Sequence, residues 1–301
     1  MTVSKSEPRI TNHQPQSGQL ASMVLRQGIR RLTAGGIEHA RQEAEWLLGR
    51  LVGARPLELY LDEPPIPAQA AEQFFAQLEA RASGAPLQYL LGEAEFFGRP
   101  FAVEPGVFIP RPETEAIAEA AIRQLRVLEA TRGRALRVAD LGTGSGCIAL
   151  TLAHALPACV VVRVEVSWWA LRVASQNVRR HGLSDRVCLI QGSWTAPLRF
   201  PVDALVSNPP YIPTARVEEV PRDVRQEPRL SLDGGPDGMR DLLQLMAEAP
   251  RVLQPGGLLV MECGEEHVER LQRASVSACW QAAEPLHDLA GRPRGLLLKK
   301  R

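Results

Sequence analysis

The sequence contains little cysteine, and its cysteines are scattered. The five thiols, Cys147, Cys159, Cys188, Cys263 and Cys279, are odd in number and show no CxxC spacing. Such a set argues against both a disulfide framework and a structural zinc site. We therefore expect reduced, mostly buried thiols and no bound metal.

Long apolar runs and a net charge of either sign are also missing. No run approaches the roughly 18 apolar residues of a membrane span, and no apolar segment follows the basic residues near the N-terminus. The formal net charge of +1 gives no overall attraction to nucleic acid or to an anionic membrane. We expect a cytoplasmic protein with no membrane and no direct nucleic-acid partner.

Four segments of different composition are present. Residues 1–17 are polar and contain two prolines, which predicts a disordered tail. Residues 18–83 show helical periodicity, which predicts a small all-α domain without clustered catalytic residue types. Residues 84–109 are rich in Gly, Pro and aromatics, and 101–103 with 107–109 suggest a hairpin linker. A larger domain is expected over 110–301.

Apolar strands and helices alternate along that larger domain. The strands are expected at 136–141, 160–166, 187–191, 202–207, 258–263, 280–286 and 295–299. Strands that are almost wholly apolar, with helices between them, are typical of a parallel sheet covered on both faces. The fold class is therefore α/β, preceded by the small helical domain.

A glycine loop follows the first of these strands. Asp140 and Leu141 lead into Gly142, Thr143, Gly144, Ser145 and Gly146, a GxGxG pattern that differs from the dinucleotide and phosphate-loop fingerprints. Glycines there permit positive φ and close approach of the backbone to a ligand. Asp140 just before them favours a ligand that bears an ammonium group.

The next two strands end in residues suited to an adenosine. Glu165 stands 19 residues beyond Gly146, where a carboxylate can accept hydrogen bonds from ribose hydroxyls. Trp194 follows the third strand and could cover an adenine face. No basic cluster replaces Glu165, so a 2′-phosphate is not expected. NAD and S-adenosylmethionine both fit these features.

The stretch Asn208, Pro209, Pro210 and Tyr211 decides between the two. Two prolines at a strand end make a stiff loop. The Asn208 side-chain oxygen and the Pro209 carbonyl can accept both N–H groups of a planar –NH₂, while Tyr211 packs on that acceptor. Methyl transfer to such a nitrogen relies on positioning and electrostatics, without a metal or a nucleophilic cysteine. Asn208 would also contact the methyl donor.

With these motifs in place, the sequence resembles the HemK/PrmC family of peptide chain release factor N5-glutamine methyltransferases over nearly the whole chain after the tail. The matching stretches are 96–98, 109–115, 140–146, 208–212, 227–228, 232–238, 255–257 and 288–292. The Asn-Pro-Pro-Tyr element is shared with amino-methylating DNA enzymes, so 109–115 and the helical domain narrow the resemblance to this family.

The resemblance implies a Rossmann-like, seven-stranded class I S-adenosylmethionine-dependent methyltransferase domain. The helical domain, residues 18–83, would bind a class 1 release factor and present the glutamine of its Gly-Gly-Gln motif to Asn208 and Tyr211. S-adenosylmethionine would lie over Gly142 to Gly146, with Glu165 on the ribose and Trp194 near the adenine, and would leave as S-adenosylhomocysteine. We expect the protein to act as a monomer.

Three positions depart from the family pattern. Glu165 stands where Asp is usual, Trp168 where Pro is usual, and Ser193 where an Asp commonly binds the adenine amine. We expect Ser193 to weaken cofactor binding by about 1 kcal/mol, because a neutral hydrogen bond replaces a charged one. Glutamine methylation of a ribosomal protein, adenine-N6 methylation of nucleic acid, and a cofactor-binding module without turnover are the alternatives.

Overall fold

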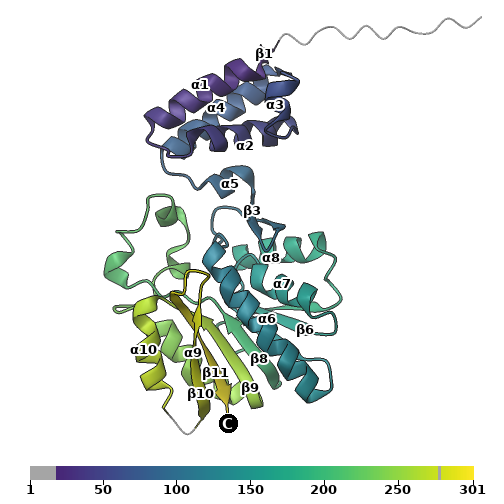
Figure 1. Ribbon diagram of the computed structural model, residues 1–301, viewed down its shortest axis with the longest axis vertical. Coiled ribbons are helices and arrows are strands. Elements are labelled where there is room, and N and C mark those ends of the chain that lie inside the picture. The colour runs from purple at the N-terminus through teal and green to yellow at the C-terminus, as the bar shows by residue number, and fades with distance from the viewer. Residues whose placement is uncertain (1–17, 277–278) are drawn as a thin grey trace, which may run out of the picture. The chain divides into compact units, whose positions relative to one another are not determined.

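The computed structural model describes residues 18–276 and 279–301, so the predicted tail at 1–17 lies outside the described residues. The chain divides into two compact units between Leu91 and Gly92. This point lies inside the predicted linker. Each unit is described by itself (Figure 1).

The N-terminal unit is built from helices around a small apolar core. Its helices are α1 (Ala21–Ala34), α2 (Ala40–Val52), α3 (Glu58–Leu61), α4 (Ala68–Ala82) and α5 (Leu87–Leu91). Two short strands, β1 (Gln19–Leu20) and β2 (Pro65–Ile66), pair antiparallel. Leu25, Leu47, Leu48 and Phe74 are fully buried between the helices.

Two contacts fix how α1, α2 and α4 pack. A Cβ at Gly28 would lie 2.6 Å from the Phe74 ring, so only glycine lets α1 approach α4 this closely. Arg81 on α4 donates to the Glu43 carboxylate on α2 at 2.6 Å, and both side chains are almost fully buried. The helical periodicity thus produces the expected helical unit, to which the short β1–β2 pair is added.

The C-terminal unit begins with a hairpin of β3 (Glu93–Phe96) and β4 (Arg99–Ala102). Its two turn residues, Phe97 (φ 52°) and Gly98 (φ 66°), both have positive φ, as a type I′ turn requires. The hairpin was expected from residues 101–103 and 107–109, which was wrong. The later segment joins no strand, because the Ile109 amide donates to the Glu227 carboxylate instead.

A seven-stranded sheet forms the centre of this unit. Its strands are β5 (Arg137–Leu141), β6 (Val160–Glu165), β7 (Val187–Gln191), β8 (Val202–Ser207), β9 (Leu253–Glu262), β10 (Trp280–His287) and β11 (Pro293–Lys300). Their spatial order is β10-β11-β9-β8-β5-β6-β7. The expected parallel pairing holds from β7 to β9, whereas β11 runs antiparallel to both of its neighbours. The sheet is therefore mixed.

Helices cover both faces of the sheet. They are α6 (Pro112–Arg132), α7 (Cys147–Ala155), α8 (Trp168–Arg180), α9 (Arg240–Val252) and α10 (Glu265–Ala274), with three short 3₁₀ turns at Thr214–Arg216, Val224–Gln226 and Arg229–Ser231. The helices α6 and α7 share one apolar core with the sheet, and α9 and α10 share the other (Figure 1). Strands buried on both sides explain the nearly unbroken apolar runs.

Arg111 is the N-cap of α6, and no side chain caps this end. Pro255, Gly256 and Gly257, one of the stretches that carry the family resemblance, lie within β9, where the register against β8 shifts between Val202 and Ala204. Among the described helices, none combines the length and apolar character needed to cross a membrane.

Candidate active site

A cavity of about 520 Å³ opens at the carboxyl ends of β5 to β8. Register pairs Leu141 with both Val164 and Ser207, and Glu165 with Gln191, so four strands end at nearly the same level. The strand β5 has β6 on one side and β8 on the other, which makes this the point where strand order reverses. In open α/β sheets such a crevice binds small molecules, and the volume lies within their usual range of about 300–1,000 Å³.

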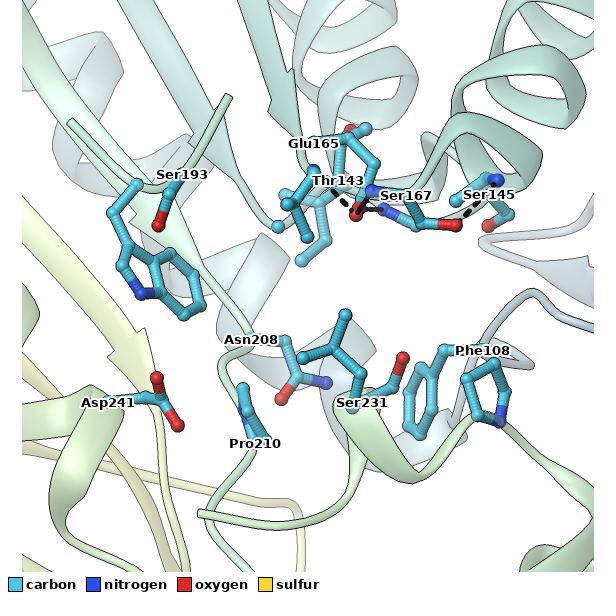
Figure 2. A pocket seen from close by; sticks show the side chains of 18 of the residues that line it. Phe108, Thr143, Ser145, Glu165, Ser167, Ser193, Asn208, Pro210, Ser231 and Asp241 are labelled. Atoms are coloured by element: carbon cyan, nitrogen blue, oxygen red, sulfur yellow. Dashed lines mark hydrogen bonds between the residues drawn. The ribbon is translucent and has the colours of Figure 1, made fainter. Parts of the chain in front are cut away.

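Polar side chains face one another across the cavity (Figure 2). One wall carries Thr143, Ser145, Glu165 and Ser167, and the opposite wall carries Phe108, Asn208, Pro210 and Ser231. Ser193 and Asp241 lie at one end. Every lining residue belongs to the C-terminal unit.

The glycine loop has the backbone that its sequence predicts. Gly142, Gly144 and Gly146 have φ of 71°, 55° and 85°, values that residues with a Cβ rarely adopt. A Cβ on Gly142 would come within 3.2 Å of the Trp194 ring, and one on Gly146 within 3.0 Å of the Leu150 side chain. The loop therefore packs closely against the Trp194 and Leu150 side chains. Gly142 and Gly144 form part of the cavity wall.

Asp140 lies beneath this loop rather than on its surface. It is 1% exposed, and its Oδ2 accepts hydrogen bonds from the Thr143 hydroxyl at 2.5 Å and the Ala149 amide at 3.2 Å. Burial raises the pKa of this carboxyl to about 6, and the charge of Arg163 on β6 opposes that shift. Asp140 thus holds the loop in shape, and it is absent from the cavity lining.

Glu165 joins β6 to the glycine loop. Its Oε2 accepts from the Gly144 amide at 2.9 Å, and its Oε1 accepts from the amides of Val166 and Ser167, both at 2.9 Å. Each carboxylate oxygen has two lone pairs, so Oε2 can still accept a hydroxyl from a ligand. Glu165 lines the cavity, as its position at the strand end predicts.

Trp194 and Ser193 follow β7 at the edge of the cavity. Trp194 has a positive φ of 46° and its ring lies against Gly142. Ser193 is exposed.

Trp168, which stands where the family usually has Pro, is 65% exposed at the start of α8 and is not among the lining residues. Its neighbour Ser167 caps that helix by accepting from the Ala170 amide.

The Asn-Pro-Pro-Tyr loop divides its residues between the cavity and the protein interior. Asn208 and Pro210 line the cavity, whereas Pro209 and Tyr211 do not. The Asn208 Nδ2 donates to the Thr114 hydroxyl oxygen at 3.1 Å. The Tyr211 hydroxyl donates to Glu262 Oε1 at 3.0 Å, and burial together with the charge of Glu262 raises the pKa of Tyr211.

A second glycine-rich segment, residues 232–238, supports this loop from behind. The Ile212 amide donates to the Leu232 carbonyl, and the Gly234 amide donates back to the Ile212 carbonyl. A Cβ on Gly234 would lie 2.7 Å from the Pro210 carbonyl oxygen, and one on Gly238 would lie 2.2 Å from that of Tyr211. These glycines are needed for close backbone contact with the loop.

Other stretches on which the family resemblance rests also contact one another. Glu227 accepts from the Ile109 amide at 2.9 Å and pairs with the Arg111 guanidinium. Glu115 accepts from the Phe97 amide at 2.8 Å. Because these pairs fix the segment that carries Phe108, Pro110 and Thr114, they shape the wall opposite the glycine loop.

The cavity contains no reactive thiol. Cys147 is the one cysteine on its wall within the described part of the chain, and burial raises the pKa of that thiol to about 12. No group of three or more His, Cys, Asp or Glu side chains in residues 18–276 and 279–301 could hold a metal ion. The arrangement suits binding and orientation of a ligand.

Sequence reasoning missed several wall and supporting residues, namely Phe108, Pro110, Thr114, Ser167, Ser231, Asp241, Gln244 and Glu262. Thr114 lies inside the 109–115 stretch, whose sequence gives no sign that this hydroxyl contributes to a cavity wall. Glu262 is the single acid in the otherwise uncharged run 258–263. The sequence therefore did contain a signal for Glu262, namely a single acid at the end of an apolar strand.

The fold, with a cavity at the carboxyl ends of its parallel strands, is that of an α/β domain of the methyltransferase type. A family model described as PrmC N-terminal domain matches residues 23–92, and one described as Methyltransferase small domain matches residues 101–222. A protein named release factor glutamine methyltransferase from Moorella thermoacetica is 45% identical over 93% of this chain and 99% of its own. A protein of the same name from Geobacter sulfurreducens is 41% identical over 84% of this chain and 89% of its own.

The chain belongs to the release factor glutamine methyltransferase family. Among solved structures, the hMettl16 catalytic domain in complex with MAT2A 3′UTR hairpin 6 is similar in fold. It matches with a TM-score of 0.50 and 15% identity, and covers 80% of this chain and 85% of that chain. The expected family and the seven-stranded methyltransferase fold with a helical N-terminal unit are confirmed.

Proposed function

We propose that the protein transfers a methyl group from S-adenosylmethionine to the side-chain amide nitrogen of the glutamine in the Gly-Gly-Gln motif of class 1 peptide chain release factors. The observation that carries this proposal is the hydrogen bond from Asn208 Nδ2 to Thr114. With its nitrogen used in this way, Asn208 has its side-chain oxygen left as an acceptor for an –NH₂ group in the cavity.

The residues present fit the methyl donor. Gly142 and Gly144 line the cavity, and Gly144 offers backbone that a ligand can approach, since a Cβ there would meet nothing within 4 Å. Glu165 offers a carboxylate for ribose hydroxyls, and Trp194 offers an aromatic ring beside Gly142. When bound, S-adenosylmethionine supplies an electrophilic methyl group, whose bond to sulfur breaks as its bond to the acceptor nitrogen forms.

The chain's own residues would then orient the acceptor. Asn208 Oδ1 accepts one N–H of the glutamine amide, and we assign the other to the carbonyl of Pro209, which follows Asn208 directly although it does not itself line the cavity. The two bonds turn the nitrogen lone pair toward the methyl group. Both acceptors also stabilise the positive charge that develops on this nitrogen. Tyr211 is tethered through its hydroxyl to Glu262, so its ring is held in one orientation. The nitrogen finally gives one proton to water.

The N-terminal unit would bind the release factor. Residues 18–83 contribute no group to the cavity, and exposed apolar side chains such as Leu57 and Leu61 offer a surface for a protein. We further propose that the enzyme works as a monomer in the cytoplasm, where release factors act, with S-adenosylhomocysteine as product. The near-zero net charge supports a protein acceptor over a nucleic acid.

The test is methyl transfer from labelled S-adenosylmethionine to a purified release factor, with the modified residue found by mass spectrometry. We expect one methyl group on the Gly-Gly-Gln glutamine, and none when that glutamine is replaced by alanine. Asn208→Ala should lower kcat by roughly 100-fold or more. The matched amide variant Gln272→Ala on α10, which lies outside the cavity wall, should leave it unchanged.

Two results would contradict this function. One is binding of S-adenosylmethionine without transfer to the release factor. The other is label that appears instead on a ribosomal-protein glutamine or on adenine in an oligonucleotide.

A further inference from the structure

A buried acid lies behind the Asn-Pro-Pro-Tyr loop and is not part of the cavity wall. Glu262 is the last residue of β9 and is 2% exposed. Its Oε1 accepts from the Tyr211 hydroxyl at 3.0 Å, while no described residue donates to its Oε2 with hydrogen-bond geometry. Register pairs Met261 with Ser207, so Glu262 lies beside the point where β8 passes into Asn208.

Thr114 connects this acid to the cavity. Thr114 is 2% exposed but contributes to the cavity wall, and its hydroxyl oxygen accepts from Asn208 Nδ2 at 3.1 Å. A hydroxyl that accepts one hydrogen bond still has its own proton to donate. Thr114 and Tyr211 are the two hydroxyls that favour the ionised form of Glu262.

The direction of these contacts determines which atom Asn208 presents. An ionised carboxylate can only accept, so with Glu262 ionised the neighbouring Thr114 hydroxyl would turn its proton toward the carboxylate and leave its lone pairs for Asn208 Nδ2. The Asn208 oxygen is then available for the acceptor amide. If the Asn208 amide were reversed, its –NH₂ would face the –NH₂ of the substrate, and two donors do not bind each other.

We propose that Glu262, acting through Thr114 and Tyr211, is a positioning residue that keeps the Asn208 oxygen turned toward the methyl acceptor. The inference rests on the proposed function, because it assigns Glu262 to the same site. Neither Glu262 nor Tyr211 lines the cavity, so Glu262 acts on the acceptor only through its neighbours. Disruption of this chain of contacts should therefore change turnover more than cofactor binding.

The charge of Glu262 gives the proposal a pH signature. Burial, helped by the charge of Glu113, raises the pKa of this carboxyl to about 7, and Thr114, Tyr211 and Arg294 oppose the shift. Other titratable neighbours are the thiols of Cys147 and Cys263, whose pKa values the Glu262 charge helps to raise to about 12. Neither thiol ionises near neutrality. His267 packs edge-on against the Tyr211 ring, and burial lowers its pKa.

A protonated Glu262 can donate a hydrogen bond as well as accept one. The Thr114 lone pairs are then no longer reserved for Asn208 Nδ2, and the Asn208 oxygen is no longer held toward the acceptor. Neither a glutamine amide nor a sulfonium titrates near neutral pH, so the reactants themselves give no pH dependence there. We expect kcat of the wild-type enzyme to fall as the pH drops from about 8 to about 6.

The experiment compares four variants of the full chain with a release factor as substrate. Thr114→Val removes the hydroxyl at nearly constant volume, and Thr114→Ser restores it. Glu262→Gln removes the titration. Thr151→Val is the matched control, since Thr151 is equally buried on α7, its hydroxyl has no hydrogen-bond partner among the described residues, and it is not in the cavity wall.

We expect Thr114→Val to lower kcat roughly 10- to 100-fold while the S-adenosylhomocysteine Kd stays within about twofold. Thr114→Ser should recover most of the rate, and Glu262→Gln should lose the fall in rate at acid pH. Equal kcat for Thr114→Val and Thr151→Val, or an unchanged acid limb in Glu262→Gln, overturns the proposal. Thermal unfolding and S-adenosylhomocysteine binding show whether each variant is folded.

A second measurement does not depend on activity. The carboxyl carbon of Glu262, identified by its loss in Glu262→Gln, can be titrated by ¹³C NMR. Thr114→Val and Tyr211→Phe should each raise the pKa of Glu262, because each removes a hydroxyl that favours the charge. If neither variant changes this pKa, the network is refuted. A wild-type enzyme that methylates no release factor contradicts the proposed function, and the NMR titration then tests the network by itself.

Discussion

Three carboxyl groups at or near the carboxyl ends of sheet strands differ in what surrounds them. Asp140 on β5 bonds to a hydroxyl and an amide beneath the glycine loop. Glu165 on β6 accepts three backbone amides and borders the cavity. Glu262 on β9 accepts the Tyr211 hydroxyl and is 2% exposed. Carboxyl groups at the strand ends thus fix a loop, offer a ligand site or support a neighbouring loop, according to their burial and their partners.

The raised pKa of Glu262 predicts a pH-dependent stability. The carboxyl has a pKa of about 7 in the folded protein, above its ordinary 4.5. A group whose pKa rises on folding is bound to its proton more tightly in the native state, so stability falls as the pH rises through this interval. Glu262→Gln removes the effect.

We therefore expect the unfolding free energy of Glu262→Gln, relative to wild type, to rise by roughly 2–3 kcal/mol between about pH 5 and about pH 8. Urea unfolding at several pH values measures this difference. Any effect of the substitution on stability that is the same at every pH cancels, because the test uses only how the difference in unfolding free energy changes with pH. A flat difference would mean that the carboxyl titrates normally.

Ser193 predicts a gain in cofactor affinity on substitution. It is exposed at the end of the cavity that also carries Asp241. Ser193→Asp should tighten S-adenosylmethionine binding by about 1 kcal/mol, because a charged acceptor replaces a neutral one for the adenine amine. Calorimetry measures the Kd, and Ser193→Asn provides the neutral control with no expected gain. No tightening in Ser193→Asp would show that the adenine amine does not reach this residue.

At the scale of elements, the Asn-Pro-Pro-Tyr loop depends on the glycines behind it. Gly238 has a φ of 75°, and a Cβ there would lie 2.2 Å from the Tyr211 carbonyl oxygen. Gly133, which ends α6, has a similar φ of 62° with nothing within 4 Å of its Cβ. The two positions share the backbone strain of an alanine substitution but differ in what the new methyl group meets.

Alanine at either position should cost about 1 kcal/mol of stability from the left-handed backbone. Only Gly238→Ala should also displace the Tyr211 backbone, and we expect it to lower kcat roughly 100-fold. Gly133→Ala should keep the wild-type kcat. Thermal unfolding and steady-state kinetics on both variants measure the two effects separately, and an equal kcat would contradict the supporting role of residues 232–238.

Local sequence patterns predict the strands and the cavity edge well, since apolar runs and glycines act within a few residues. The ends of β7 and β8 fall where the sequence predicts them. The reversed direction of β11 and the role of Thr114 could not be predicted in this way. The Asn208–Thr114 bond joins residues 94 positions apart, and the Tyr211–Glu262 bond joins residues 51 apart. Such pairings follow from tertiary packing, which one sequence does not reveal.

At the scale of the whole molecule, cofactor binding and recognition of the release factor should be separable. All residues of the cavity wall lie between Gly106 and Gln244, inside the unit that begins at Gly92. That unit contains both of the large apolar cores that enclose the sheet. The core of α1 to α5 consists of residues from the first unit alone. Each unit therefore has the apolar interior of an independent domain.

A protein that consists of residues 92–301 should bind S-adenosylhomocysteine with a Kd within about threefold of the full chain, because distant, separate groups contribute almost additively. Its kcat/KM on a complete release factor should fall by roughly tenfold or more, since the surface that we propose binds this partner is removed. On a short Gly-Gly-Gln peptide, too small to reach the first unit, both proteins should have the same rate. Full activity of the fragment on the release factor would show that residues 18–83 do not bind it. Loss of S-adenosylhomocysteine binding would instead show that the cavity needs the helical unit to hold its shape.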